Sequence, residues 1–341
     1  MSFHNYVIIN QGTQTLGDTY FGVWVDADVG TATDDYVGCD VQRGLGYAYN
    51  GDAYDETSSS SSGYLDKTPA VGVDFFEGPY QDADEIDNPL TINFSDAVDS
   101  LGIPYGGIGI GYGDGVIDNE RFGMRRFVYY NNSGSNLNGE PTTPLHHYNY
   151  MNGIWLNGQK MTYGEDGTNS DGTPCEYMFP GDTDPYNWGT GGLQTESWSE
   201  VGEGNPPADR RFIQSAGPFT LEPGDYNNIT MGIVWARGTS GDPNQSVSLM
   251  RQADDKAQAL FDNCFEIVSG PDAPDVTIQE LENELILYLT NDNSLSNNFH
   301  EEYVQFDPGI PKLDISGEEY DSLTRSYTFQ GYQIYQLFDN S

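Results

Sequence analysis

The chain has 341 residues, of which 13 are lysine or arginine and 53 are aspartate or glutamate, so its formal net charge at pH 7 is −40. Nucleic-acid binding needs a basic face that neutralises phosphates, and this composition excludes one. The longest apolar runs, such as residues 285–289, fall far short of a bilayer span. We therefore expect no nucleic-acid partner and no direct membrane insertion.

Aromatic residues indicate that the chain nevertheless forms a packed core. It contains 5 tryptophans, 24 tyrosines and 16 phenylalanines, and such rings bury large areas at a modest entropy cost. Its 41 glycines and 18 prolines predict many tight turns. A fold dominated by β-strands follows from these counts.

Short segments in which apolar residues alternate with polar ones predict strands along the first two thirds of the chain. Turn residues such as Asn-Gly and Pro-Gly separate these segments. The spacing favours a mainly β fold, a jelly-roll-like β-sandwich with long loops rich in aspartate and glycine. The predicted strands are residues 6–9, 19–26, 70–76, 122–130, 212–221 and 228–236.

One helix is predicted near residues 246–264. Ser246 is a candidate N-cap, and apolar residues from Val247 to Cys264 recur at steps of three and four. The opposite face carries Arg251, Asp254 and other charged residues. This pattern predicts a helix packed on the sandwich.

Residues 269–275 have the composition of a linker rich in proline and glycine. They separate a predicted domain of residues 1–268 from a second one of residues 276–341, in which 284–290 and 327–337 are predicted strands. A complete sandwich domain needs roughly 100 residues, so the second domain is expected to be partial.

The densest acidic cluster lies in residues 26–40, and it is our predicted calcium site. A compact fold with this net charge repels itself, and bound cations relieve that repulsion. Calcium prefers carboxylate and carbonyl oxygens, which a loop containing glycine can wrap around one ion. The alternative is a solvated acidic loop on a surface adapted to salt water. The predicted ligands are Asp26, Asp28, Asp34, Asp35 and Asp40.

A second acidic segment, residues 113–120, resembles the latter half of a calcium loop. Asp114 and Asp118 are its candidate ligands, but Ile110 and Tyr112 stand where earlier carboxylates would be needed. A simple turn explains the segment equally well.

Two tryptophans in polar, glycine-containing loops, Trp188 and Trp198, are candidate platforms for stacking sugar rings. The alternative is that they cover the core beneath these loops. The sequence contains neither a nucleophile elbow nor a zinc-protease motif. Glycoside hydrolysis requires only two opposed carboxylates, and the sequence cannot show which of its 53 acidic residues would form such a pair. A non-enzymatic role is therefore favoured. The three cysteines, Cys39, Cys175 and Cys264, allow one disulfide or three buried thiols.

Five strings carry a resemblance to a known group of proteins. They are YFGVWVDAD at 20–28, DDYVGCD at 34–40, PAVGVDFFEGP at 69–79, YMFPGD at 177–182 and DRRFIQSAGPFTLEPGD at 209–225. They resemble large secreted and cell-surface proteins of Bacteroidota that use the type IX secretion system. The tail, with Pro271, Pro274 and GYQIY at 331–335, is similar to the first strands of an immunoglobulin-like fibronectin type III module.

This resemblance implies an exported, calcium-bearing, multidomain surface protein. The first ten residues lack the pattern of a signal peptide, and predicted strands lie at both ends of the chain, so we expect a fragment of a longer exported protein. The predicted function is that of a calcium-stabilised extracellular module for adhesion, structural assembly or glycan binding, with glycans or other copies of the protein as partners. The alternative is a catalytic or accessory domain of a secreted hydrolase, such as a glycoside hydrolase.

Overall fold

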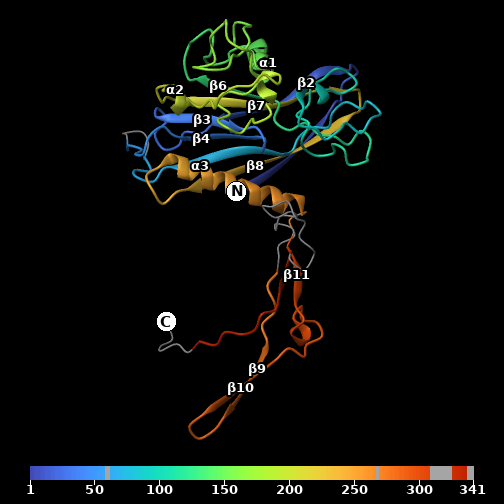
Figure 1. Ribbon diagram of the computed structural model, residues 1–341, viewed down its shortest axis with the longest axis vertical. Helices are drawn as coiled ribbons and strands as arrows, with labels where there is room; N and C mark the ends of the chain where they lie inside the picture. The colour runs from blue at the N-terminus through green and yellow to red at the C-terminus, as the bar shows by residue number, and fades with distance from the viewer. Residues whose placement is uncertain (58–61, 264, 266–268, 308–324, 336–341) are drawn as a thin grey trace. The chain divides into compact units, whose positions relative to one another are not determined.

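The computed structural model describes residues 1–57, 62–263, 265, 269–307 and 325–335. The chain divides into two compact units, Met1–Ala257 and Gln258–Ser341. The first unit is mainly β, and its two antiparallel sheets lie face to face in Figure 1, as the predicted sandwich requires.

Each sheet combines strands that are distant in sequence. The larger one has the order β1-β8-β5-β4-β3, and the smaller one has the order β2-β7-β6. All neighbouring strands in both sheets are antiparallel. The strands are β1 (Ser2–Ile9), β2 (Leu16–Asp26), β3 (Asp35–Asp40), β4 (Leu45–Asn50), β5 (Pro69–Glu77), β6 (Arg126–Asn131), β7 (Arg210–Leu221) and β8 (Tyr226–Arg237).

The two sheets pack closely because a small residue faces a long one. Gly46 on β4 leaves room for Gln214 on β7, since a Cβ at Gly46 would lie 2.2 Å from the Gln214 side-chain oxygen. The amide of Gln214 donates to the carbonyl of Val73, at 2.9 Å, and thereby links the two sheets. Around it, Phe127 and Phe212 pack with ring centroids 5.0 Å apart.

Residues 35–40 form strand β3, so the expectation that all of residues 26–40 form a loop is wrong. Every residue of β3 and β4 is buried. The small sheet covers one face of this pair, and the helix α3 (Pro243–Asp262) covers the other, where Arg251 donates to the hydroxyl of Tyr47. Because both faces are buried, the alternation that identifies a strand is missing from the sequence.

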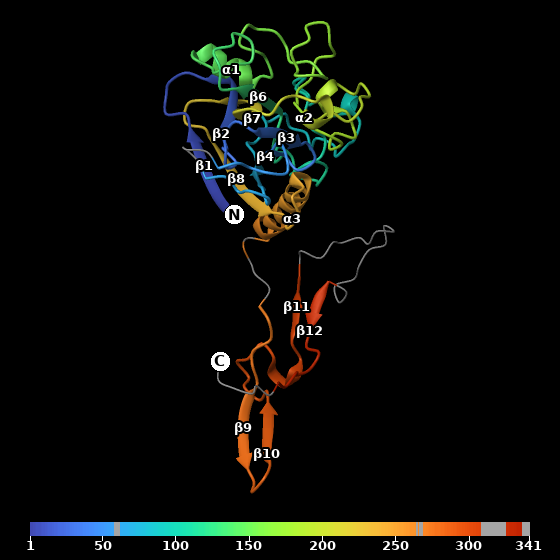
Figure 2. The same ribbon diagram turned by 90° about the vertical axis from the view of Figure 1, so that its left-hand side faces the viewer.

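The predicted packed helix is confirmed as α3, although its start differs from the prediction. Asp242 is the cap, since its carboxylate accepts from the backbone N–H of Asn244 at 2.9 Å, and Pro243 occupies the first turn. Ser246 lies inside the helix, where its hydroxyl donates to the carbonyl of Thr68 at 2.6 Å. Figures 1 and 2 both show α3 along the outer face of the larger sheet.

Long loops and short helices cover the smaller sheet. They include α1 (Pro144–Met151), α2 (Glu200–Glu203) and the 3-10 turns η1 (Phe94–Asp96) and η2 (Trp188–Thr190). Fully buried rings fill the space beneath them, such as Trp155 packed edge-on against Tyr129 and Tyr150. Cys39 and Cys175 are buried free thiols, and Cys264 lies outside the described residues.

The described residues of the second unit form two antiparallel strand pairs. Strand β9 (Asp275–Glu280) pairs with β10 (Leu285–Thr290), and β11 (Val304–Phe306) pairs with β12 (Ser326–Thr328). A 3-10 turn, η3 (Phe299–Glu301), precedes β11. The prediction for 284–290 matches β10. Only Tyr327 and Thr328 of the strand predicted at 327–337 lie in a strand among the described residues. No helix in the described part of the chain is both long and apolar enough to cross a membrane.

Candidate metal centre

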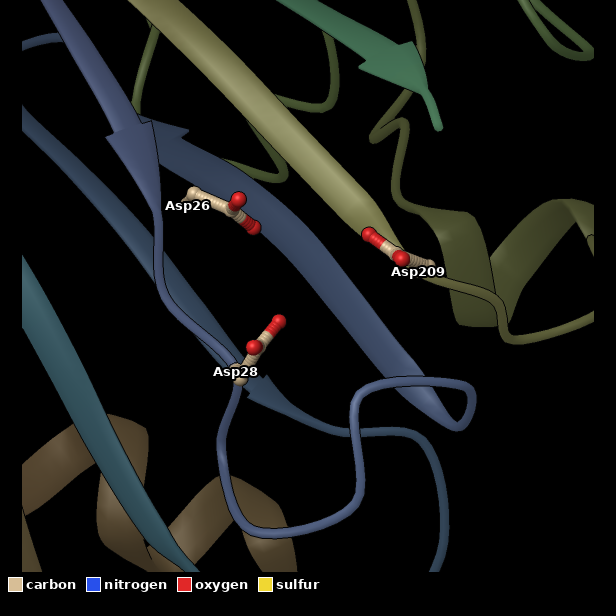
Figure 3. Close-up of side chains that lie close together, drawn as sticks. All are labelled: Asp26, Asp28 and Asp209. Carbon is tan, nitrogen blue, oxygen red and sulfur yellow. The ribbon is translucent and has the colours of Figure 1, made fainter. Parts of the chain in front are cut away.

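Three carboxylates converge where β2 ends. Asp26 is the last residue of β2, Asp28 follows it in the loop, and Asp209 immediately precedes β7. One oxygen from each lies within 4.8 Å of the others, and Figure 3 shows the three side chains directed toward one another. We call Asp26, Asp28 and Asp209 the carboxylate trio.

One arginine offsets part of the trio's charge. The guanidinium of Arg211 lies 3.0 Å from Asp26 and 3.7 Å from Asp209, and it also contacts Glu140 at 2.7 Å. The pKa of Asp28 is raised by burial and by repulsion from Asp26 and Asp209, in spite of Arg211. The trio thus carries more negative charge than the nearby arginine neutralises, which favours a further cation.

The loop after the trio is held in one conformation by its own backbone contacts. Gly30 has φ +83°, and a Cβ there would lie 1.8 Å from the carboxylate of Asp55. Only glycine combines this backbone conformation with so close an approach. The N–H of Val29 donates to Asp35 at 3.0 Å, and that of Thr31 donates to Asp55 at 3.0 Å. The loop therefore presents its carboxylates in a fixed arrangement.

Asp34 and Asp35 lie beyond this loop in surroundings that disfavour negative charge. Burial, together with the charge of Asp55, raises the pKa of Asp34 to about 6. Burial also raises the pKa of Asp35 to about 8, with repulsion from Asp34 and Asp28. For both residues, the largest charged influences are other carboxylates.

Asp40 does not join this group, so including it in one calcium site with Asp26 to Asp35 is wrong. It lies at the far end of β3 from Asp35, about 17 Å away at the rise of an extended strand. Its buried carboxylate is paired with Arg43 at 2.9 Å and with Arg251 at 3.0 Å. Asp40 is therefore already neutralised.

Asp114 caps a local turn, whereas Asp118 joins its segment to residues 84–85. The carboxylate of Asp114 accepts from the Val116 N–H at 2.8 Å and from the Asn119 amide at 2.9 Å, and these bonds lower its pKa. Asp118 accepts from the N–H groups of Asp84 and Glu85. The contacts of Asp114 correspond to the simple turn considered for this segment, and both carboxylates already have hydrogen-bond donors.

Trp188 and Trp198 are core residues, 5 % and 1 % exposed. The expectation that they present their rings to a sugar is wrong, because Trp188 packs on Phe94 and Trp198 packs between Tyr163 and Phe179. The aromatic content of these loops reflects the core that they cover.

A cavity of about 570 Å³ lies beside these two tryptophans. Tyr163, Tyr177 and the loop from Pro180 to Ser197 line it, and the charged side chains in its wall are Asp182, Asp184 and Glu196. Burial raises the pKa of Asp184, while its two oxygens accept from the N–H groups of Trp188 and Gly189. This carboxylate therefore fixes the shape of the loop.

Sequence reasoning missed three residues near the predicted site. Asp209 is about 180 positions from Asp28, so local spacing could not place them together. Asn50 is the first residue of an Asn-Gly pair that predicts only a turn, and Asp55 follows this turn. A signal for Asp209 did exist, because it begins one of the strings that carry the family resemblance.

Comparison of the chain with protein-family models, with curated proteins and with solved structures finds no match.

Proposed function

We propose that this chain is a calcium-stabilised extracellular module, secreted or exported to the cell surface. In this role it serves adhesion, structural assembly or glycan binding. The observation that supports calcium is the convergence of Asp26, Asp28 and Asp209 beside a single arginine. The family resemblance of the sequence supports export through the type IX system.

The chemistry of the trio suits a hard divalent cation. All three side chains offer oxygen, which calcium accepts in flexible arrangements of six to eight ligands. Softer metals such as zinc favour thiolate and imidazole ligands, which the trio does not provide. A bound calcium ion would supply the positive charge that Arg211 only partly provides, and would join the end of β2 to the start of β7.

Calcium is expected to raise the thermal stability of the protein. An ion at about 100 times its dissociation constant stabilises a native protein by about 2.7 kcal/mol, relative to the same protein with excess chelator. The variant Asp28→Asn should lose the part of this increase that comes from the ion at the trio, and in chelator it should melt at a higher temperature than wild type because one repulsive charge is gone. Differential scanning calorimetry with and without calcium measures both effects.

The matched control is Asp171→Asn, which removes the same charge at an exposed position. It should keep the full response to calcium. Equal melting temperatures of the wild type in calcium and in chelator would contradict the proposal, and would leave the acidic surface as an adaptation to salt.

For glycan binding, we place the ligand in the cavity beside Trp188 and Trp198. Its acidic and amide side chains, including Gln194 and Glu196, are suited to accept hydrogen bonds from sugar hydroxyls. The second candidate function, hydrolysis of a glycoside, is favoured by the raised pKa of Asp184 in the same cavity. The two backbone bonds to that carboxylate favour binding over catalysis.

A glycan array in the presence of calcium tests this role. The variant Glu196→Gln is expected to weaken binding at least tenfold, because it removes an acceptor from the cavity wall, while Asp171→Asn should bind like wild type. Mass spectrometry of the bound glycan separates the two functions, since an intact glycan supports a binding module and a cleaved one supports the hydrolase. Wild-type protein that binds no glycan would exclude the glycan role.

A further inference from the structure

Four side-chain oxygens beside the carboxylate trio are buried and have no hydrogen-bond partner among the residues that the structure describes. They are both oxygens of Asp34, one oxygen of Asp35 and the amide oxygen of Asn50. Asp35 is 2 % exposed and Asn50 is 0 % exposed. Burying a polar oxygen without a partner is costly, and four such atoms in adjacent residues require a common explanation.

The backbone brings these three residues together. Asp35 and Asn50 are directly opposite each other in the β3–β4 pair, so their side chains leave the sheet on the same face, with Cβ atoms about 5 Å apart. The N–H of Gly51 donates to the carbonyl of Asp34 at 2.6 Å, which fixes Asp34 beside the end of β4. The Asn50 amide nitrogen donates to the carbonyl of Asp52, at 3.1 Å, so its oxygen is directed elsewhere.

A proton cannot satisfy this group of atoms. One proton on Asp35 would give a single donor for Asn50 and would leave both oxygens of Asp34 unpaired. The charged groups that act on Asp34 and Asp35 are further carboxylates, among them Asp28 and Asp55. A divalent cation would instead contact several oxygens at once and balance the two aspartates.

We propose that Asp34, Asp35 and Asn50 hold a second divalent cation of the calcium type, separate from the ion at the carboxylate trio. This inference rests on the proposed calcium dependence and extends it. The ion would bind the amide oxygen of Asn50 together with the carboxylates, an oxygen-only set that calcium accepts. It would fasten β3, the edge strand of the larger sheet, to the end of β4.

Calcium stoichiometry, measured by isothermal titration calorimetry on the full chain, tests the second site. We expect two ions for wild type, one for Asn50→Ala and one for Asp35→Asn. Asp28→Asn should retain only the second ion, and the double variant Asp28→Asn with Asp35→Asn should bind none. Circular dichroism checks folding, and if Asn50→Ala does not fold, the nearly isosteric Asp35→Asn decides.

The matched control is Asp74→Asn, another buried strand aspartate whose oxygens have no partner in the described part of the chain. It should still bind two ions. If wild type binds one ion that only Asp28→Asn removes, the second site is overturned while the proposed function stands. If wild type binds no calcium, both fail.

Discussion

We expect the wild-type protein to lose stability as the pH rises from about 4 to 7. Replacing Asp254 by asparagine is expected to abolish this loss. Asp254 lies on α3 and faces Asp74 on β5, and the two carboxyl groups are 2 % and 1 % exposed. Both oxygens of Asp74 and one of Asp254 lack a hydrogen-bond partner among the described residues. Two carboxylates that are buried together cannot both be charged without a large cost.

The charged groups around this pair do not relieve it. Arg43 is the arginine that acts on both carboxyl groups, but it already contacts Asp40 at 2.9 Å and Asp255 at 2.8 Å. Burial therefore raises the pKa of Asp254 to about 7, with added repulsion from Asp255. Burial and the charge of Asp254 likewise raise the pKa of Asp74. If the two carboxyl groups share one proton, a hydrogen bond between Asp254 and Asp74 joins α3 to β5.

The direction of the pH effect follows from these raised values. In the unfolded chain, Asp254 loses its proton near its ordinary value of 3.8, whereas in the folded chain it does so near pH 7. Between these values the folded state binds more protons, so stability falls as the pH rises, by roughly 4 kcal/mol in total. The stability that protonated Asp254 contributes is complete below about pH 4 and is lost above about pH 7.

Urea unfolding from pH 4 to 8, at a constant excess of calcium, measures this effect. Asp254→Asn keeps the shape of the side chain and can donate to Asp74, so it should equal wild type near pH 4 and exceed it by several kcal/mol near pH 8. Asp171→Asn controls for net charge and should follow the wild-type curve. Parallel curves for wild type and Asp254→Asn would show that the pair does not share a proton.

The sequence predicted the elements whose patterns are local. Alternation identified β2 and β8, which have one more buried and one more exposed face, and the apolar stripe identified α3. Strand β7 was also predicted, although none of its residues is exposed. Strands β3 and β4 have no exposed face, so their sequence shows no alternation and the acidic residues suggested a loop. The same ambiguity made Asp40 look like a ligand, whereas the extended strand carries it to a pair of arginines.

The candidate site was only partly predictable for a different reason. Asp26, Asp28, Asp34 and Asp35 lie within one short segment, so their spacing was sufficient to predict an acidic centre. Asp209 and Asn50 reach it through strand pairing, β2 with β7 and β3 with β4, which local spacing does not specify. Trp188 and Trp198 were misplaced because composition does not show whether a ring in a loop faces solvent or core.

Breaking the ion pair between Glu200 and Arg210 is expected to destabilise the protein by about 3 to 5 kcal/mol. Glu200 begins α2, where Ser199 is the cap, and its side chain is 0 % exposed. Arg210 begins β7, and two of its nitrogens donate to one oxygen of Glu200, at 2.7 and 3.0 Å. The guanidinium also donates to the carbonyl of Pro206.

Glu200 connects the two sheets in addition to neutralising Arg210. Its other oxygen accepts from the N–H of Val37, at 3.0 Å, on β3. Because β3 is an edge strand, this N–H has no neighbouring strand on that side. Glu200→Gln would leave the buried charge of Arg210 without its counter-ion, and Glu200→Leu would also remove the acceptor for Val37.

A double-mutant cycle in urea, with calcium held constant, separates these contributions. Glu200→Gln and Arg210→Met should each cost several kcal/mol, while the double variant should cost clearly less than their sum, because neither charge then remains buried alone. Asp255→Asn, which removes an exposed partner of Arg43, should cost less than about 1 kcal/mol. Additive losses in the cycle would mean that the two side chains act independently, and would contradict a stabilising role for their ion pair.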